Sequence, residues 1–209
     1  MKNFPKAGLL IITLVIPALT FLLLKLFATN HYDLPYFNPE VTSNGQVVVV
    51  NGDTTFRKSP SIQLASGNVN LDSQIALISF LPENCADSCK LVLANLKRIY
   101  DMRNAIANLS IKTLAPGNAN IPVESSDEMG KEGWNVIKAS QDDIAAFMNA
   151  QSPYFKAALE LYPEENRLIL IDAKGFTRGY YNGTDPKEID RLMAELKILD
   201  YETEASANR

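Results

Sequence analysis

Two cysteines, Cys85 and Cys89, are the residues of this chain whose type and spacing could do chemistry. They are the only cysteines among 209 residues, and they stand four positions apart. Such positions share one face of a helix, and with Cys85 in the turn before a helix the two sulfurs can reach disulfide distance. A thiol pair in this position can exchange disulfides or bind a soft metal ion such as copper(I). Both chemistries stay open at this point.

A third possibility is that the pair forms only a stabilising disulfide. A cross-link over four residues closes a short loop, so its entropic contribution is small compared with that of a long-range bridge. We therefore favour redox-active or metal-binding use of the pair over a purely structural one. The start of a helix and the neighbouring Lys90 both favour the thiolate form that either use requires.

The flanking segments predict that the cysteines lie where a strand leads into a helix. Residues 74–81 are almost continuously apolar, which is typical of a central strand buried on both faces. Residues 91–103 carry an apolar stripe at helical spacing, broad enough to pack on a sheet.

The remaining pattern predicts one α/β domain over residues 46–200. Residues 59–72 have no clear pattern, and residues 115–133 form a long loop. The other expected elements are a hairpin at 46–58, strands at 109–114, 134–139, 167–172 and 176–181, and helices at 141–150 and from Pro186 onward. This order predicts a thioredoxin-like fold, a mixed sheet flanked by helices, with the cysteines at the first strand-to-helix junction.

The N-terminus predicts one transmembrane helix within a membrane anchor at residues 1–28. Residues 7–24 are 18 consecutive uncharged and mostly apolar residues, which exceeds the roughly 7 to 15 of a cleaved signal peptide. Lys2 and Lys6 precede this run, so the N-terminus is expected in the cytoplasm and the domain outside, on the periplasmic side. Residues 29–45 are predicted to be a linker, and residues 201–209 a polar, frayed tail.

Charge and composition exclude several function classes. The formal charge is −4, and the acidic and basic residues are interspersed without a Lys/Arg cluster, so no nucleic-acid partner is expected. His31 is the single histidine of the chain. This inventory excludes most hydrolytic triads and all histidine-rich zinc sites.

Three segments carry a resemblance to a known family: the cysteine segment 84–89, Gly133-Trp134-Asn135-Val136, and the long run from Leu168 to Asp185. On these residues the chain resembles the SCO/SenC family. Its members are membrane-anchored thioredoxin-fold proteins linked to copper delivery during cytochrome c oxidase assembly. The resemblance covers roughly residues 30–199.

The chain also departs from the family pattern. The family binds copper with its two cysteines and a histidine a few residues upstream of the Leu168–Asp172 segment, but residues 162–167 contain no histidine. Glu164 and Glu165 lie in that stretch, and carboxylates suit harder ions than copper(I). His31 is a poor substitute because it is expected beside the membrane. Two further departures are Lys90, where the family usually has proline, and Ala115-Pro116, in place of an Asp-Pro.

The resemblance implies an extracytoplasmic protein that acts in thiol–disulfide redox during cytochrome c oxidase maturation. Cys85, expected to be the more exposed thiol, would attack, and Cys89 would resolve the mixed disulfide. One alternative is a copper(I) metallochaperone with Cys85 and Cys89 as ligands, and another is a non-catalytic interaction protein on a thioredoxin scaffold. No other cofactor is expected. The expected partners are the membrane and a cytochrome oxidase subunit or a thiol-bearing exported protein.

Overall fold

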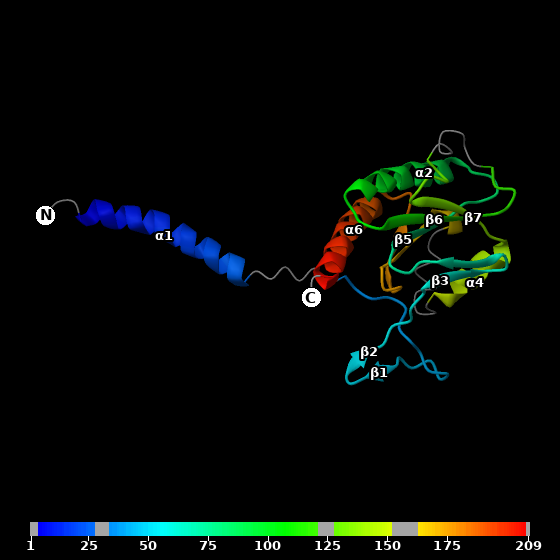
Figure 1. Cartoon of the computed structure of the whole chain (residues 1–209), viewed down its shortest axis with the longest axis horizontal. Helices are drawn as coiled ribbons and strands as arrows, with labels where there is room; N and C mark the ends of the chain where they lie inside the picture. The colour runs from blue at the N-terminus through cyan, green and yellow to red at the C-terminus, as the bar shows by residue number, and fades with distance from the viewer. Residues whose placement is uncertain (1–3, 28–33, 121–127, 152–162, 208–209) are drawn as a thin grey trace. The chain divides into compact units, whose positions relative to one another are not determined.

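The computed structural model describes residues 4–27, 34–120, 128–151 and 163–207, and the chain divides into two compact units, Met1–Asp33 and Leu34–Arg209. The first unit contains helix α1 (Phe4–Phe27), with Pro17 inside it (Figure 1). Within the described ranges, no helix combines the length and the apolar character needed to cross a membrane. The transmembrane helix expected around residues 7–24 is therefore not supported by the structure.

The second unit is built on a mixed sheet of five strands in the order β7-β6-β5-β8-β9. Its strands are β5 (Ile75–Phe80), β6 (Leu109–Ala115), β7 (Trp134–Lys138), β8 (Arg167–Ile171) and β9 (Thr177–Asn182). β5, β6 and β7 run parallel, whereas β8 is antiparallel to both β5 and β9. The predicted α/β fold with a mixed, thioredoxin-like sheet is confirmed.

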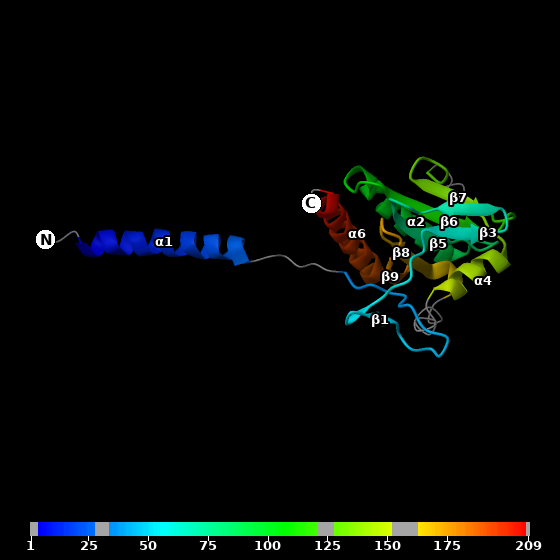
Figure 2. The ribbon, with the colours of Figure 1, turned by 60° about the horizontal axis from the view of Figure 1, so that its bottom comes forward.

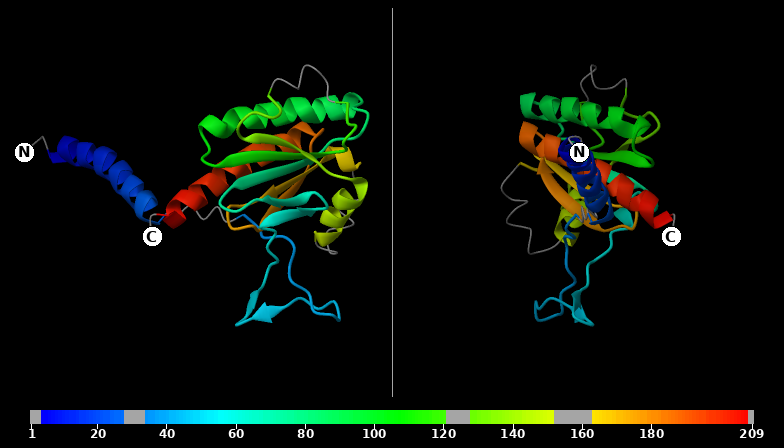
Figure 3. Two further views of the ribbon diagram at one scale, coloured as in Figure 1. Left: turned by 45° about the vertical axis from the view of Figure 1, so that its right-hand side comes forward. Right: turned by 90° about the vertical axis from the view of Figure 1, so that its left-hand side faces the viewer.

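Different elements cover the two faces of this sheet. Helices α2 (Asp87–Tyr100) and α6 (Pro186–Ala207) lie on one face, and α4 (Gln141–Ala150) with a hairpin lies on the other (Figures 2 and 3). Because side chains alternate along a strand, Leu77 of β5 belongs to the core under α2, and Ile78 belongs to the core under α4. All six residues of β5 are buried, as expected for a central strand.

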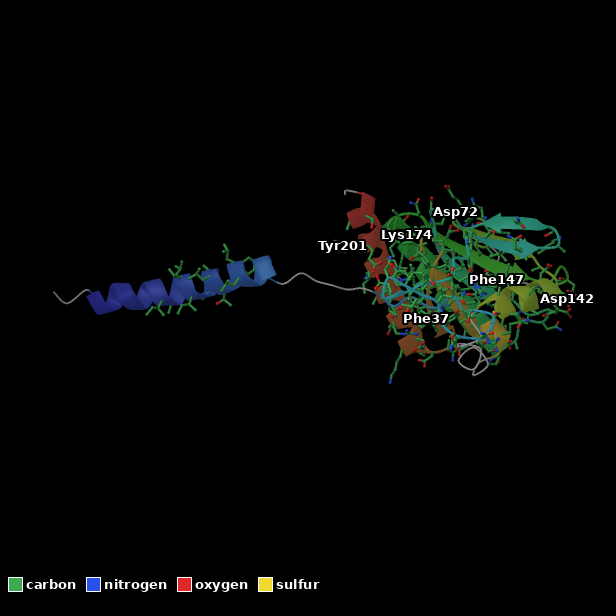
Figure 4. The ribbon with its side chains drawn as sticks, turned by 90° about the horizontal axis from the view of Figure 1, so that it is seen from below. Phe37, Asp72, Asp142, Phe147, Lys174 and Tyr201 are labelled. Atoms are coloured by element: carbon green, nitrogen blue, oxygen red, sulfur yellow. A yellow bond between two sulfur atoms is a disulfide. The ribbon has the colours of Figure 1, made fainter. Side chains whose placement is uncertain are left out.

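Helix α4 begins where its sequence predicts. Ser140 precedes it as the N-cap, and its hydroxyl accepts a hydrogen bond from the backbone N–H of Asp143, while the Asp143 carboxylate accepts one from the Ser140 backbone N–H. Together these bonds form a capping box. Asp142 also lies in the first turn of α4, where Figure 4 labels it, and Phe147 of the same helix is buried in the core.

The strands before β5 differ in part from the expectation. The hairpin at 46–58 is short, with β1 (Val49–Val50) and β2 (Asp53–Thr54) joined at Asn51 and Gly52, which both have positive φ, and it projects from the domain (Figures 1 and 3). Residues 59–72, expected to be irregular, contain a second hairpin, β3 (Ser61–Leu64) with β4 (Gly67–Asn70). This hairpin covers the sheet, and its residue Ile62 is fully buried in the core under α4.

The boundaries at both ends of the domain also differ from the expectation. α6 continues to Ala207, so the prediction of a frayed tail is wrong for residues 201–207, although Tyr201 itself is exposed (Figure 4). Leu34, expected in the linker, belongs to the core of the second unit. The cause is a buried cluster in which Arg178 binds the Glu202 carboxylate of α6 and the Leu34 carbonyl oxygen.

Candidate redox site

The two cysteines lie at the junction between β5 and α2, as their spacing predicts. Cys85 lies in the turn that follows β5, and Cys89 lies in the first turn of α2, which begins at Asp87. A disulfide joins them, with the two Cα atoms 5.2 Å apart, a separation common for disulfides. The local fold therefore brings both sulfurs into bonding contact without any residue from elsewhere in the chain.

The two cysteines differ in their exposure. Cys89 is 2% exposed and belongs to the core cluster under α2, with Val92 and Leu93. Cys85 is only partly buried and packs on the edge of that cluster. A partner thiol approaching from solvent therefore meets the Cys85 sulfur first. The Cys89 sulfur is buried, and it takes part in exchange only through its disulfide bond to Cys85.

The start of α2 favours negative charge near the sulfurs. The N-cap residue is Ala86, whose side chain cannot accept a hydrogen bond, so it does not cap the N–H groups of the first turn. These groups leave a partial positive charge beside the cysteines. Lys90 adds less than the sequence suggested, since its Nζ lies 3.5 Å from Asp87 Oδ1 and both side chains are well exposed.

A second segment lies alongside the approach to Cys85. The backbone N–H of Asn120 donates to the Glu83 carbonyl oxygen over 2.9 Å, and Asn84 pairs with Asn120 in a parallel bridge. Ala119 packs against the same core cluster as Cys85. The sequence gives no signal for this neighbour, because residues 115–120 form the first part of the expected long loop and carry no local pattern. Their position follows from the parallel pairing of β5 and β6, which continues beyond both strands.

The segment before β8 also reaches α2. It forms a short 3-10 helix, η2 (Glu164–Asn166), and Asn166 accepts a hydrogen bond from the Gly183 N–H over 2.6 Å. Gly183 in turn accepts one from the Asn95 side chain of α2 over 2.9 Å. Gly183 lies so close to Val92 that an added Cβ would stand 3.1 Å from its methyl groups. The segment before β8 is the place where the SCO/SenC family has its third copper ligand. Through Gly183 it contacts α2 near Val92, about one helical turn beyond Cys89.

The residues of this stretch do not complete a metal site. Burial raises the pKa of Glu164, and the Asn166 Oδ1 atom is buried without a hydrogen-bond partner among the described residues. In the part of the chain that the structure describes, no three His, Cys, Asp or Glu side chains converge as metal ligands would. His31 and Tyr162 lie outside the described residues. Within the described residues, the donors for a soft metal are thus the two cysteine sulfurs, and they can bind only after reduction.

Comparison with known proteins identifies the fold. No protein-family model matches the chain, and no curated protein matches it either. Among solved structures, the chain is similar to a SCO1/SenC family lipoprotein from Bacillus anthracis str. Ames, with a TM-score of 0.50 and 14% identity over 80% of this chain and 98% of that chain. It is also similar to BsSco, with a TM-score of 0.50 and 15% identity over 81% of this chain and 96% of that one.

BsSco is described as a member of the Sco family of cytochrome c oxidase assembly proteins in which a disulfide switch was identified. At these identities, the similarity establishes the fold. The protein is a thioredoxin-like α/β protein whose fold is that of SCO/SenC structures. Its cysteine pair, Cys85 and Cys89, has CxxxC spacing.

Proposed function

We propose that this protein is a divergent SCO/SenC-like thiol–disulfide protein that acts outside the cytoplasm in the maturation of cytochrome c oxidase. The observation that carries the proposal is the Cys85–Cys89 disulfide at the start of α2, with Cys85 partly exposed and Cys89 buried. A bridge over four residues contributes little to folding through chain entropy, so stabilising the fold is a weak reason for it. The SCO-type fold and the disulfide switch described for BsSco support the same role.

The exchange follows from the unequal exposure of the two cysteines. In the reduced protein, the Cys85 thiolate attacks one sulfur of a partner disulfide, which forms a mixed disulfide and releases the first partner thiolate. The Cys89 thiolate then attacks the Cys85 sulfur and releases the second partner thiolate. Two electrons pass to the partner, which also takes up the two protons, and the Cys85–Cys89 bond forms. The same steps in reverse oxidise a partner dithiol.

Trapping of the mixed disulfide tests this assignment. In Cys89→Ser the resolving thiol is missing, so we expect a stable covalent adduct between Cys85 and a disulfide-bonded probe peptide. We expect no adduct for Cys85→Ser, because its remaining thiol is buried. Ser88→Ala changes the same turn without removing a sulfur and should exchange like the wild type. Equal trapping by both cysteine variants would contradict the assigned roles.

The reduction potential separates an exchange protein from an inert bridge. We expect the Cys85–Cys89 pair of the full-length protein to equilibrate with glutathione at a potential above about −300 mV, the range of labile and functional disulfides. A potential well below this value, with no exchange, would leave a non-catalytic interaction protein as the better interpretation.

Delivery of copper(I) is the second candidate function, with the metal as cargo. Two thiolates held in one turn suit a soft ion that accepts two ligands, and the positive start of α2 stabilises the resulting negative charge. We expect the reduced protein to bind copper(I) more weakly than a site with an added histidine. Competition with a copper(I) chelator measures this affinity, with Cys89→Ser as the control. Failure of the wild type to compete better than Cys89→Ser would exclude the role.

We also propose that residues 1–28 anchor the chain in the membrane, with the N-terminus in the cytoplasm and the second unit on the periplasmic side. The uncharged run at residues 7–24 and the preceding Lys2 and Lys6 support this orientation. Fractionation with alkaline carbonate, followed by protease treatment of spheroplasts, tests it. Release into the soluble fraction would contradict the anchor. The Cys89→Ser adduct isolated from cells would identify the partner, for which a cytochrome oxidase subunit or a thiol-bearing exported protein is proposed.

A further inference from the structure

An open pocket lies at the end of the sheet opposite the cysteines. Cys85 follows the carboxyl end of β5, whereas this pocket lies beside the amino-terminal halves of β6 and β7, which run parallel to β5. Its volume is about 710 Å³. Among the residues that line it are Arg103, Ser110, Lys112, Lys131 and Asn135. Neither the exchange chemistry nor the copper chemistry of the cysteines involves these residues.

Lys112 is a buried cation in this pocket. It lies in the middle of β6 and is 8% exposed, and its Nζ donates a hydrogen bond of 2.7 Å to Asn135 Oδ1. No carboxylate forms an ion pair with it among the described residues. Removal of the ammonium from water lowers the pKa of Lys112. A buried charge ordinarily has a charged partner, so the amide of Asn135 leaves this ammonium incompletely compensated.

Two further cations line the same pocket. The guanidinium of Arg103 lies 4.0 Å from the centre of the Tyr100 ring, which restrains its position. Lys131 is exposed on the segment before β7. Neither forms an ion pair within the described parts of the chain. The pocket lining carries one carboxylate, Glu132, so its formal charge is positive.

We propose that this pocket binds a multivalent oxyanion, either a phosphate group or a polycarboxylate. The ammonium of Lys112 would supply the charge at the base of the pocket, and the Asn135 amide and the Ser110 hydroxyl would supply neutral hydrogen bonds. The guanidinium of Arg103 would add a further positive charge to the pocket lining. Binding would provide Lys112 with the counter-charge that the described residues do not supply.

Calorimetric titration of the full-length protein with inorganic phosphate and, separately, with citrate tests the proposal at constant ionic strength. We expect saturable binding of at least one probe by the wild type. Binding of phosphate alone identifies a site for a phosphate group, and binding of citrate alone identifies a site for carboxylates. We expect Lys112→Met to weaken binding at least tenfold. Lys138→Gln, which removes an exposed lysine at the other end of β7, should bind like the wild type.

Asn135→Asp provides a second variant that does not depend on how Lys112→Met folds. Its carboxylate would stand beside the Lys112 ammonium and compete with the anion, so we expect at least a tenfold loss of affinity with the domain still folded. Absence of saturable binding of either probe to the wild type would overturn the proposal. Equal affinity in Asn135→Asp and Lys138→Gln would overturn it as well.

Discussion

Two buried cations of the same domain, Arg178 and Lys112, differ in how far their positive charge is compensated by neighbouring groups. Arg178 of β9 is 3% exposed, and its Nη1 atom donates to Asp172 over 2.9 Å and to Glu202 over 3.1 Å. Its other nitrogens donate to the carbonyl oxygens of Leu34 and Pro35. Lys112 of β6 is 8% exposed, and among the described residues its ammonium has one partner, the Asn135 amide oxygen.

This difference separates a structural charge from one that is available to a ligand. The partners of Arg178 come from the start of the domain, from the end of β8 and from α6, so the guanidinium holds three distant segments together. Lys112 joins only two neighbouring strands, and a pocket opens beside it. Removal of either cation tests the distinction.

The largest expected effect is that of Arg178→Met. The substitution leaves Asp172 buried without its counter-charge and frees Leu34 from α6, so we expect a loss of roughly 3–5 kcal/mol in the free energy of unfolding. Urea denaturation of the full-length protein measures this change. Arg98→Gln removes an exposed pair with Asp190 and should cost less than about 1 kcal/mol. Equal losses of stability in Arg178→Met and Arg98→Gln would show that the buried cluster around Arg178 does not hold the three segments together.

A smaller loss is expected for Glu202→Gln. Arg178 keeps Asp172 as its counter-charge in this variant, and Glu202 is partly exposed to solvent, so we expect a loss of about 1–2 kcal/mol. Because Glu202 Oε1 also accepts a hydrogen bond from the Leu34 N–H, the last turns of α6 and the start of the domain should lose protection together. Amide hydrogen exchange measures this coupling. Faster exchange in α6 alone would contradict it.

The smallest effect, and one that depends on pH, is expected for Lys112→Met in buffer without multivalent anions. Burial lowers the pKa of Lys112 in the folded protein below its ordinary value of 10.5, so the unfolded chain binds more protons between these two pKa values. The wild type therefore gains stability as the pH rises through this window, whereas Lys112→Met does not. At pH values below the pKa that Lys112 has in the folded protein, Lys112→Met should be at least as stable as the wild type.

Thermal unfolding of both proteins from pH 7 to pH 10 checks this prediction. Lys138→Gln serves as the control, since Lys138 is exposed and its loss should leave the pH dependence of the wild type unchanged. A loss of several kcal/mol in Lys112→Met at pH 7 would show that Lys112 stabilises the fold as Arg178 does.

Local patterns in the sequence determined the elements that position the cysteines. The apolar run before Cys85 forms β5, the apolar stripe after Cys89 forms most of α2, and Ser140 caps α4 as its position predicts. These elements depend on contacts between near neighbours in the chain, so their own residues are enough to predict them. The proximity of the two sulfurs is also determined locally, because Cys85 and Cys89 stand only four positions apart.

Only the tertiary structure decided which polar residues are buried and where the domain begins and ends. β6 alternates in sequence like a half-exposed strand, yet all seven of its residues are buried, because neighbouring strands and the covering layers enclose it. The polar tail continues helix α6, where Glu202 binds Arg178, and the Leu34 carbonyl oxygen accepts a hydrogen bond from the same guanidinium. The partners in these contacts stand 24 and 144 positions apart. At such separations a local pattern carries no signal, and only the packed chain reveals the pairing.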